Sequence, residues 1–237
     1  FVADLEPSSK GDVPKHIFFL TADAFGVVPP VSKLTKEQAM FYFVLGYTAK
    51  LAGTEIGVTE PQATFSPCFG APFMLRHPSV YAKLLGEYLD KHNINVWLVN
   101  TGWTGGAYGE GSRFPIKVTR QIIRQVQANN VNNTQTEADP IFGLNIPVGI
   151  DGVEPDMLQP QKTWKDPSAY VPKAKELKPI IDKVITIGKI NTLSSKKILF
   201  SKLQDKSSVT KLTTILSKRY EKRNGGYSRV VKSGFRF

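Results

Sequence analysis

The sequence predicts an α/β segment over residues 1–170, followed by a small basic α+β domain over residues 171–237. Two observations lead to this prediction. In the first part, short apolar runs alternate with stretches of helical spacing, which is the pattern of an α/β layer. In the second part, three helical patterns precede a turn and an alternating run, and the charge changes abruptly. We therefore place a domain boundary near Tyr170.

The first elements follow from local signals. An apolar run from His16 ends in Asp, Ala and Gly, and it predicts a buried strand. Thr35 and Gln38 have the spacing of a capping box, so we expect a helix to begin there. Its apolar stretch runs from Ala39 to Tyr47.

The rest of the first part continues the alternation. Four apolar residues at helical spacing predict the buried face of a second helix, and they are Val80, Leu84, Leu85 and Leu89. Ile94 opens another strand that leads to a glycine-rich loop, and Val118 begins a further short helix. The Asn- and Thr-rich residues 128–140 predict a surface loop, and the Pro-rich residues 155–167 predict irregular structure.

The second part predicts three helices and a strand. The apolar faces of the helices are Ala174, Leu177, Ile181 and Val184, then Ile198, Leu199 and Leu203, then Val209, Leu212 and Leu216. Asp205 is placed to cap the third helix. Asn224 begins a glycine-containing turn, and the run from Tyr227 alternates as a strand does.

Composition limits the class of protein. Hydrophobic residues make up 41% of the 237 residues, which is enough to bury a core. The longest apolar runs, such as the one from Phe41, are shorter than the roughly 20 residues that a membrane helix requires. Cys68 is the only cysteine, so no internal disulfide can form, and we expect a reducing compartment.

Charge divides the chain more sharply than any other property. Residues 1–170 contain 14 Lys and Arg against 16 Asp and Glu, a net charge of −2. Residues 171–237 contain 17 against 4, a net charge of +13. A charge run is often only a solvated face or a tail. Here the basic residues alternate with apolar ones at structured spacings, which favours a nucleic-acid partner.

Few motifs carry chemistry by themselves. The loop from Thr104 to Arg113 has enough glycine to bring backbone amides up to phosphate, but it lacks the residue order of a P-loop. Asp23 follows a strand, where catalytic carboxylates often lie, although a hydrogen-bonded turn is its commoner role. The three histidines lack metal-ligand spacing, and Cys68 has no evident base partner. We predict no catalytic and no metal-binding residue.

Several long motifs in order carry a family resemblance: "FLTADAFGVVPPVSKLTKEQAM", "YTAKLAGTE", "EPQATFSPCFGAPF", "VWLVNTGW", "IKVTR" and "DPIFGLNIPV". Residues from about 16 to 170 resemble the carboxy-terminal part of ATP-dependent phosphoenolpyruvate carboxykinase. The resemblance implies that Arg113, Phe114 and Thr119 contact the base and ribose of a nucleotide. It also implies a mobile active-site lid from Ile56 to Gln62, and it places the family's P-loop, metal ligands and substrate arginine upstream of this segment.

A second resemblance begins at Val171. "VPKAKELKPIIDKVITIGK", "KLQDKSSVTKL" and "KRYEKRNGGYSRVVKSGFR" resemble bacterial-type large-subunit ribosomal protein L17. This implies rRNA contacts, in which the cations expected to face phosphates are Arg219, Lys222, Arg223, Arg229, Lys232 and Arg236. Gly225 and Gly226 are expected to let the backbone approach closely, and Tyr227 is expected to stack on a base or pack inward.

The sequence therefore predicts a structural constituent of the large ribosomal subunit that binds rRNA and neighbouring ribosomal proteins. It is expected in a mitochondrion, with bacterial cytoplasm or plastid as alternatives, and is expected to need no cofactor and to contact no membrane. The alternative hypothesis is a fragment of ATP-dependent phosphoenolpyruvate carboxykinase, which would use ATP and Mg²⁺ or Mn²⁺ once a separate chain supplies the P-loop and metal site. A third hypothesis is an artificial joining of two unrelated pieces. The missing P-loop and the uneven charge favour the ribosomal hypothesis.

Overall fold

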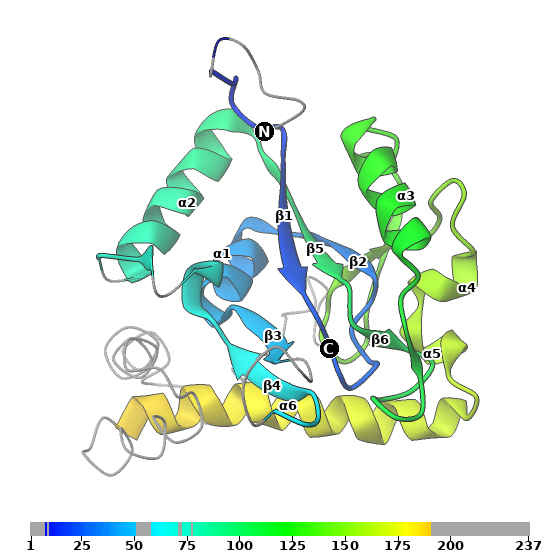
Figure 1. The fold of residues 1–237 in the computed structure, drawn as a ribbon. Coiled ribbons are helices and arrows are strands. Elements are labelled where there is room, and N and C mark those ends of the chain that lie inside the picture. The colour runs from blue at the N-terminus through cyan, green and yellow to red at the C-terminus, as the bar shows by residue number, and fades with distance from the viewer. Residues whose placement is uncertain (1–7, 9, 51–57, 71–72, 77, 191–237) are drawn as a thin grey trace, which may run out of the picture.

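The structure is a computed structural model, and it describes residue 8 and residues 10–50, 58–70, 73–76 and 78–190. Its centre is a mixed five-stranded sheet in the order β1-β5-β2-β9-β8 (Figure 1). The strands are β1 (His16–Thr21), β5 (Asn95–Asn100), β2 (Val31–Leu34), β9 (Asn145–Pro147) and β8 (Thr136–Ala138). β1 and β5 are parallel, and every other neighbouring pair in this sheet is antiparallel.

Helices cover both faces of this sheet (Figure 1). They are α1 (Lys36–Leu45), α2 (Pro78–His92), α3 (Ile116–Gln127), α4 (Pro155–Leu158), α5 (Pro160–Thr163) and α6 (Pro167–Ile190). α1 and α2 pack on one face, and α3 and α4 pack on the other. The short elements are the hairpins β3 (Tyr47–Lys50) with β4 (Gln62–Phe65) and β6 (Trp103–Thr104) with β7 (Ser112–Arg113), and the 3₁₀ turn Pro67–Phe69.

β5 divides the core into two halves because the side chains of a strand point alternately to opposite faces. Val96 and Leu98 belong to a cluster with α1, α2 and α6. Trp97 and Val99 belong to a cluster with α3 and α4. The central strand is therefore buried on both faces, which explains its continuous apolar sequence.

The predicted strands from His16 and Ile94 and the three predicted helices are confirmed as β1, β5 and α1 to α3. The predicted capping box is also confirmed: Gln38 N donates to Thr35 Oγ1 at 3.2 Å, and Thr35 N donates to Gln38 Oε1 at 2.9 Å. α1 ends earlier than predicted, because Gly46 adopts a left-handed φ of 56° and its N–H closes the helix. Tyr47 consequently begins β3.

Two predicted irregular stretches contain regular structure. Residues 128–140 include β8, which forms an edge of the five-stranded sheet. The Pro-rich residues 155–167 include α4 and α5, because a proline in the first turn of a helix lacks only an N–H that would have no helical partner. Proline thus begins these helices and does not prevent them.

The predicted buried face of α2 is half wrong. Leu89 is buried and Leu85 packs against the core, but Val80 and Leu84 are each 44% exposed. The apolar pattern of α2 therefore extends beyond the surface that the described residues bury.

α6 continues across the predicted boundary near Tyr170, which stays a prediction. Ala174 and Leu177 are fully buried, as expected for the first helix of the second part. The remaining predicted face residues, the second and third helices, the turn and the strand lie outside the side chains that the structure describes. Over the described ranges, no helix combines the length and the apolar character needed to cross a bilayer.

Candidate functional site

The loops that follow β1 and β5 meet at the carboxyl end of these two parallel strands. Trp103 N donates to Asp23 O at 2.8 Å, which joins the loops directly. Gly26 has a φ of +71°, and a Cβ on it would lie 2.0 Å from the carbonyl oxygen of Gly106. Only glycine permits this approach. Ligands of α/β sheets bind outside the carboxyl ends of the strands, so this loop pair is the candidate site.

Asp23 and Asn100 hold the first loop in place. The buried Asp23 carboxylate accepts hydrogen bonds from the Tyr47 hydroxyl at 2.8 Å and from the backbone N–H groups of Phe25, Val27 and Val28. Burial raises the pKa of Asp23, and these hydrogen bonds oppose the rise. Asn100 accepts from Asp23 N at 3.0 Å. Asp23 is therefore the hydrogen-bonded turn residue that the sequence favoured over a catalytic one.

Arg113 is the predicted nucleotide-contact residue that presents a polar group to the surface. It lies in β7, opposite Trp103 in β6. Its guanidinium donates to Thr101 O from Nε at 3.1 Å and from Nη2 at 2.8 Å, and lies 5.5 Å from the centre of the Trp103 ring. These contacts fix a planar cation beside an aromatic ring, an arrangement that arginine supports better than lysine.

The other two predicted residues follow directly in the chain. Phe114 N donates to Gly102 O at 2.9 Å, and the Phe114 side chain is only 5% exposed. Thr119 lies in α3 and is half-buried, and its N–H donates to Pro115 O at 3.3 Å. The structure thus places Arg113, Phe114 and Thr119 on one hairpin and the helix after it.

The predicted lid lies only partly within the described residues, because residues 51–57 are outside them. Its remainder leads into β4, which pairs with β3. Thr21 Oγ1, at the end of β1, donates to Tyr47 O at 2.8 Å. This bond places the β3–β4 hairpin beside the candidate loops.

Sequence reasoning missed the residues that support these loops from behind. Thr163 Oγ1 lies 2.8 Å from Thr104 Oγ1 and accepts from Gly105 N at 3.0 Å. Trp164 Nε1 donates to Gly26 O at 2.9 Å. The partners are far apart in the chain, so no local pattern could have indicated them.

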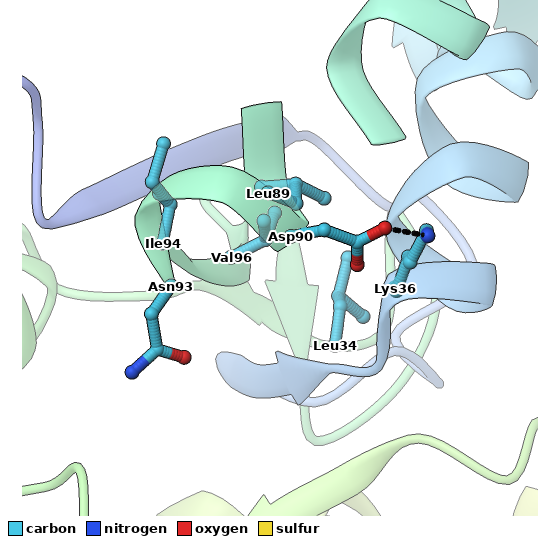
Figure 2. A pocket seen from close by; sticks show the side chains of 7 residues that line it. All are labelled: Leu34, Lys36, Leu89, Asp90, Asn93, Ile94 and Val96. Atoms are coloured by element: carbon cyan, nitrogen blue, oxygen red, sulfur yellow. Dashed lines mark hydrogen bonds and ion pairs between the residues drawn. The ribbon is translucent and has the colours of Figure 1, made fainter. Parts of the chain in front are cut away.

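A cavity of about 330 Å³ lies at the opposite end of β5. Figure 2 shows its lining residues, which are Leu34, Lys36, Leu89, Asp90, Asn93, Ile94 and Val96. Lys36 of α1 and Asp90 of α2 form an ion pair there. Val96 is near the amino end of its strand, whereas Arg113 and the candidate loops lie beyond the carboxyl end. This cavity is therefore separate from the candidate site.

Across the described ranges, His, Cys, Asp and Glu side chains do not gather in any group of three or more that could hold a metal ion. These residues therefore do not fit the metal ion that the carboxykinase resemblance implies. Cys68 is buried. The predicted RNA-contact residues lie outside the described part of the chain, and they are Arg219, Lys222, Arg223, Gly225, Gly226, Tyr227, Arg229, Lys232 and Arg236.

The fold and the paired loops define an α/β unit with a candidate ligand site at the carboxyl end of its parallel strands. Residues 1–156 match the phosphoenolpyruvate carboxykinase family in its ATP-dependent form, and the chain belongs to this family. Residues 168–237 match ribosomal protein L17. Both resemblances seen in the sequence are therefore confirmed.

Individual relatives agree with this assignment. The chain is 55% identical to the phosphoenolpyruvate carboxykinase (ATP) of Brucella suis over 177 residues, which cover 75% of the chain and 33% of that protein. It is 58% identical to the protein of the same name from Campylobacter jejuni, over 70% of the chain and 32% of that protein. The Geobacillus kaustophilus protein is also 58% identical, over 73% and 33%. The chain spans about a third of the length of these curated relatives.

Proposed function

We propose that the carboxykinase part of the chain holds the base and ribose of ATP in a phosphoenolpyruvate carboxykinase reaction, in which oxaloacetate and ATP give phosphoenolpyruvate, ADP and CO₂. The placement of Arg113 carries this proposal. Its guanidinium is exposed, held by Thr101 O and supported by Trp103 at the carboxyl end of β1 and β5. A planar cation that is already fixed loses little conformational entropy when a planar base stacks on it.

We assign the contacts to the ATP phosphates and to the metal ion to the polypeptide upstream of the third of a carboxykinase that this chain matches. Phosphoryl transfer depends on positioning and on cationic stabilisation of charge at the phosphates. The described residues contain no group of three or more His, Cys, Asp or Glu side chains that could hold a metal ion. The base and ribose contacts are those proposed for Arg113, Phe114 and Thr119. We therefore propose that the reaction uses ATP with Mg²⁺ or Mn²⁺. The upstream polypeptide would supply the groups that hold the phosphates and the metal ion.

Adenosine and ATP titrations of the 237-residue chain test this division of contacts. We expect both ligands to bind with similar dissociation constants of about 1 mM, or roughly 4 kcal/mol, because the phosphates find no partners. Arg113→Ala should weaken both by about fivefold, since a cation over an aromatic face contributes on the order of 1 kcal/mol at an exposed site. Arg120→Ala removes the same charge from the exposed surface of α3 and is the matched control. Micromolar ATP binding, or equal effects of the two substitutions, would contradict the proposal.

A second function, rRNA binding in the large ribosomal subunit, is supported by the match of residues 168–237 to ribosomal protein L17. The net charge of +13 over residues 171–237 is consistent with it. We propose that this part contacts rRNA phosphates and neighbouring ribosomal proteins. The mitochondrial location stays a prediction.

Two charge-matched triple variants test where RNA binding lies. Replacing Arg229, Lys232 and Arg236 with Gln should make the slope of log K against log salt shallower by about 2 to 3. Binding then neutralises three fewer phosphates and so releases fewer counterions. Replacing Lys117, Arg120 and Arg124 of α3 removes three exposed cations from the carboxykinase part and should leave the slope unchanged. The slopes can be measured by filter binding to large-subunit rRNA at salt concentrations from about 50 to about 300 mM. If the assignment is wrong, the two triple variants will lower the slope equally.

A further inference from the structure

The first turns of α6 are similar to both families at once. The match to the Brucella suis relative covers 177 residues, and the match to ribosomal protein L17 begins at residue 168, so the two overlap by about ten residues. The overlap falls at the start of α6, because this helix begins at Pro167. The same residues are therefore expected to serve two different folded units.

One face of these turns is used completely by the carboxykinase core. Ala174 and Leu177 are each 0% exposed, and they pack in one cluster with Tyr170. They are three positions apart, so they share one face of the helix. The sequence assigns the same face to the first helix of the ribosomal part, where Ile181 and Val184 continue it. Because a side chain without exposed surface has no room for a second partner, only one part can hold this face at a time.

The other side of these turns offers no substitute face. Pro172, Lys175 and Glu176 are exposed there, and Glu176 forms an ion pair with Lys173 at 2.9 Å. A helix with a single apolar face packs into a single core. The ribosomal part therefore gains its first helix only by taking α6 from the carboxykinase core.

The start of α6 also supports the candidate loops directly. Trp164 Nε1 donates to Gly26 O at 2.9 Å, and Tyr170 Oη donates to Val27 O at 3.0 Å. Both acceptors lie in the loop after β1, which forms half of the candidate site. In Figure 1 the β1 arrow points toward α6. Release of α6 would remove this support from behind the loop.

We propose that α6 is a switch between the two parts of the chain. The ribosomal part binds rRNA in its folded form only after α6 leaves the carboxykinase core, so rRNA and a base at the candidate loops oppose each other. This inference rests on the proposed function and names its regulation. By linkage, each ligand weakens the other by the same factor. Loss of a contact that holds α6 in the core raises the fraction of chains that is ready for rRNA.

Tyr170→Phe tests the switch, because it removes the hydroxyl that bonds Val27 O but keeps the net charge and the apolar face of α6. The 237-residue chain with this substitution should bind large-subunit rRNA about fivefold more tightly in filter binding, since one hydrogen bond shifts an equilibrium by about that factor. Trp164→Phe should also tighten binding, and it lies before the ribosomal match, so it acts only on the carboxykinase core. Tyr88→Phe removes an exposed hydroxyl from α2 and is the matched control.

Two further ligands separate the switch from simple charge effects. Long-chain polyphosphate is attracted by charge and needs no folded ribosomal part, so all four chains should bind it equally. Adenosine should bind at least about fivefold more weakly when rRNA is bound, by the same linkage. Because adenosine is neutral, repulsion by RNA phosphates cannot cause this loss. Circular dichroism melting should show that every variant is folded.

Each outcome decides between the proposals. Equal rRNA affinities of the Tyr170→Phe and Tyr88→Phe chains overturn the switch, and so does equal tightening toward polyphosphate. Adenosine that binds equally with and without rRNA also overturns it. If the chain binds no adenosine at all, the proposed base contact is wrong, and the rRNA affinities alone decide the switch. A chain that binds no rRNA contradicts the second proposed function and overturns the switch with it.

Discussion

At the residue scale, the Asp23 carboxylate organises the candidate loops. It accepts from three backbone N–H groups and from the Tyr47 hydroxyl, and all of these bonds except the one from Phe25 are buried. Two of these N–H groups, those of Val27 and Val28, share Oδ2 at 2.7 and 2.9 Å. The raised pKa of Asp23 records the cost of burial, which the four hydrogen bonds offset only in part. The position of the Gly26 turn therefore depends on one side chain.

Asp23→Asn should lower the free energy of unfolding by about 1–3 kcal/mol. An asparagine has one acceptor oxygen; if that oxygen keeps the bonds from Val27 and Val28, its NH₂ group faces the Phe25 N–H, which loses its acceptor at about 1–3 kcal/mol. Asp90→Asn is the matched control: its ion pair with Lys36 is largely exposed, so its loss should cost less than about 1 kcal/mol. Urea unfolding measures both, and similar losses for the two variants would show that Asp23 is not the organising residue.

At the element scale, α6 lies almost wholly within the ribosomal protein L17 match but packs into the core of the carboxykinase part. It begins at Pro167, one residue before the match to ribosomal protein L17 begins. Yet Tyr170 and Leu177 are buried in the core of the carboxykinase part, and Tyr170 Oη donates to Val27 O at 3.0 Å. Lys178 Nζ also donates to Ile141 O at 3.0 Å. The first turns of α6 thus complete the carboxykinase core.

Leu177→Ala should therefore destabilise the carboxykinase part by about 2–5 kcal/mol, the usual loss when a fully buried leucine is truncated. Glu176→Ala, one position earlier and exposed, should change stability by less than about 1 kcal/mol. Tryptophan fluorescence during urea unfolding reports this core, because Trp164 lies in the same cluster as Leu177 and Trp97 lies in the cluster on the other face of β5. An unchanged unfolding midpoint for Leu177→Ala would mean that α6 is not part of the core.

The elements that the sequence predicted are those with local signals. β1, β5 and α1 to α3 carry long apolar runs, helical spacing or a capping box, and these act within one element. β2 and β9 were missed because they are only four and three residues long and are defined by pairing with distant strands. The exposed half of the α2 face was predicted to be buried because apolar spacing does not show what covers a helix.

The candidate site shows the same limit. Arg113, Phe114 and Thr119 came from the family resemblance, and the structure places them on one hairpin and the following helix. The supporting contacts of Thr163 and Trp164 join segments about 60 and 140 residues apart, and no spacing rule reaches that far. Geometry was needed to find them.

At the scale of the whole molecule, the chain combines a carboxykinase-family part with a basic part that matches ribosomal protein L17. The described residues hold the Arg113 guanidinium beside the Trp103 ring but contain no metal-holding cluster. This division is the central proposal: we propose that the chain holds base and ribose and that the upstream polypeptide holds the phosphates.

Calorimetric titration with ATP and with adenosine tests this proposal most directly, if it is carried out on the complex of the 237-residue chain with the co-expressed upstream residues of the Brucella suis relative. Two charge-assisted hydrogen bonds to phosphate, at about 1.5–3 kcal/mol each, should make ATP bind at least about 100-fold more tightly than adenosine in the complex. Arg113→Ala should weaken both ligands by the same factor, because it removes only a base contact. An ATP-to-adenosine ratio near one in the complex, or an Arg113→Ala variant that binds both ligands normally, would contradict the account.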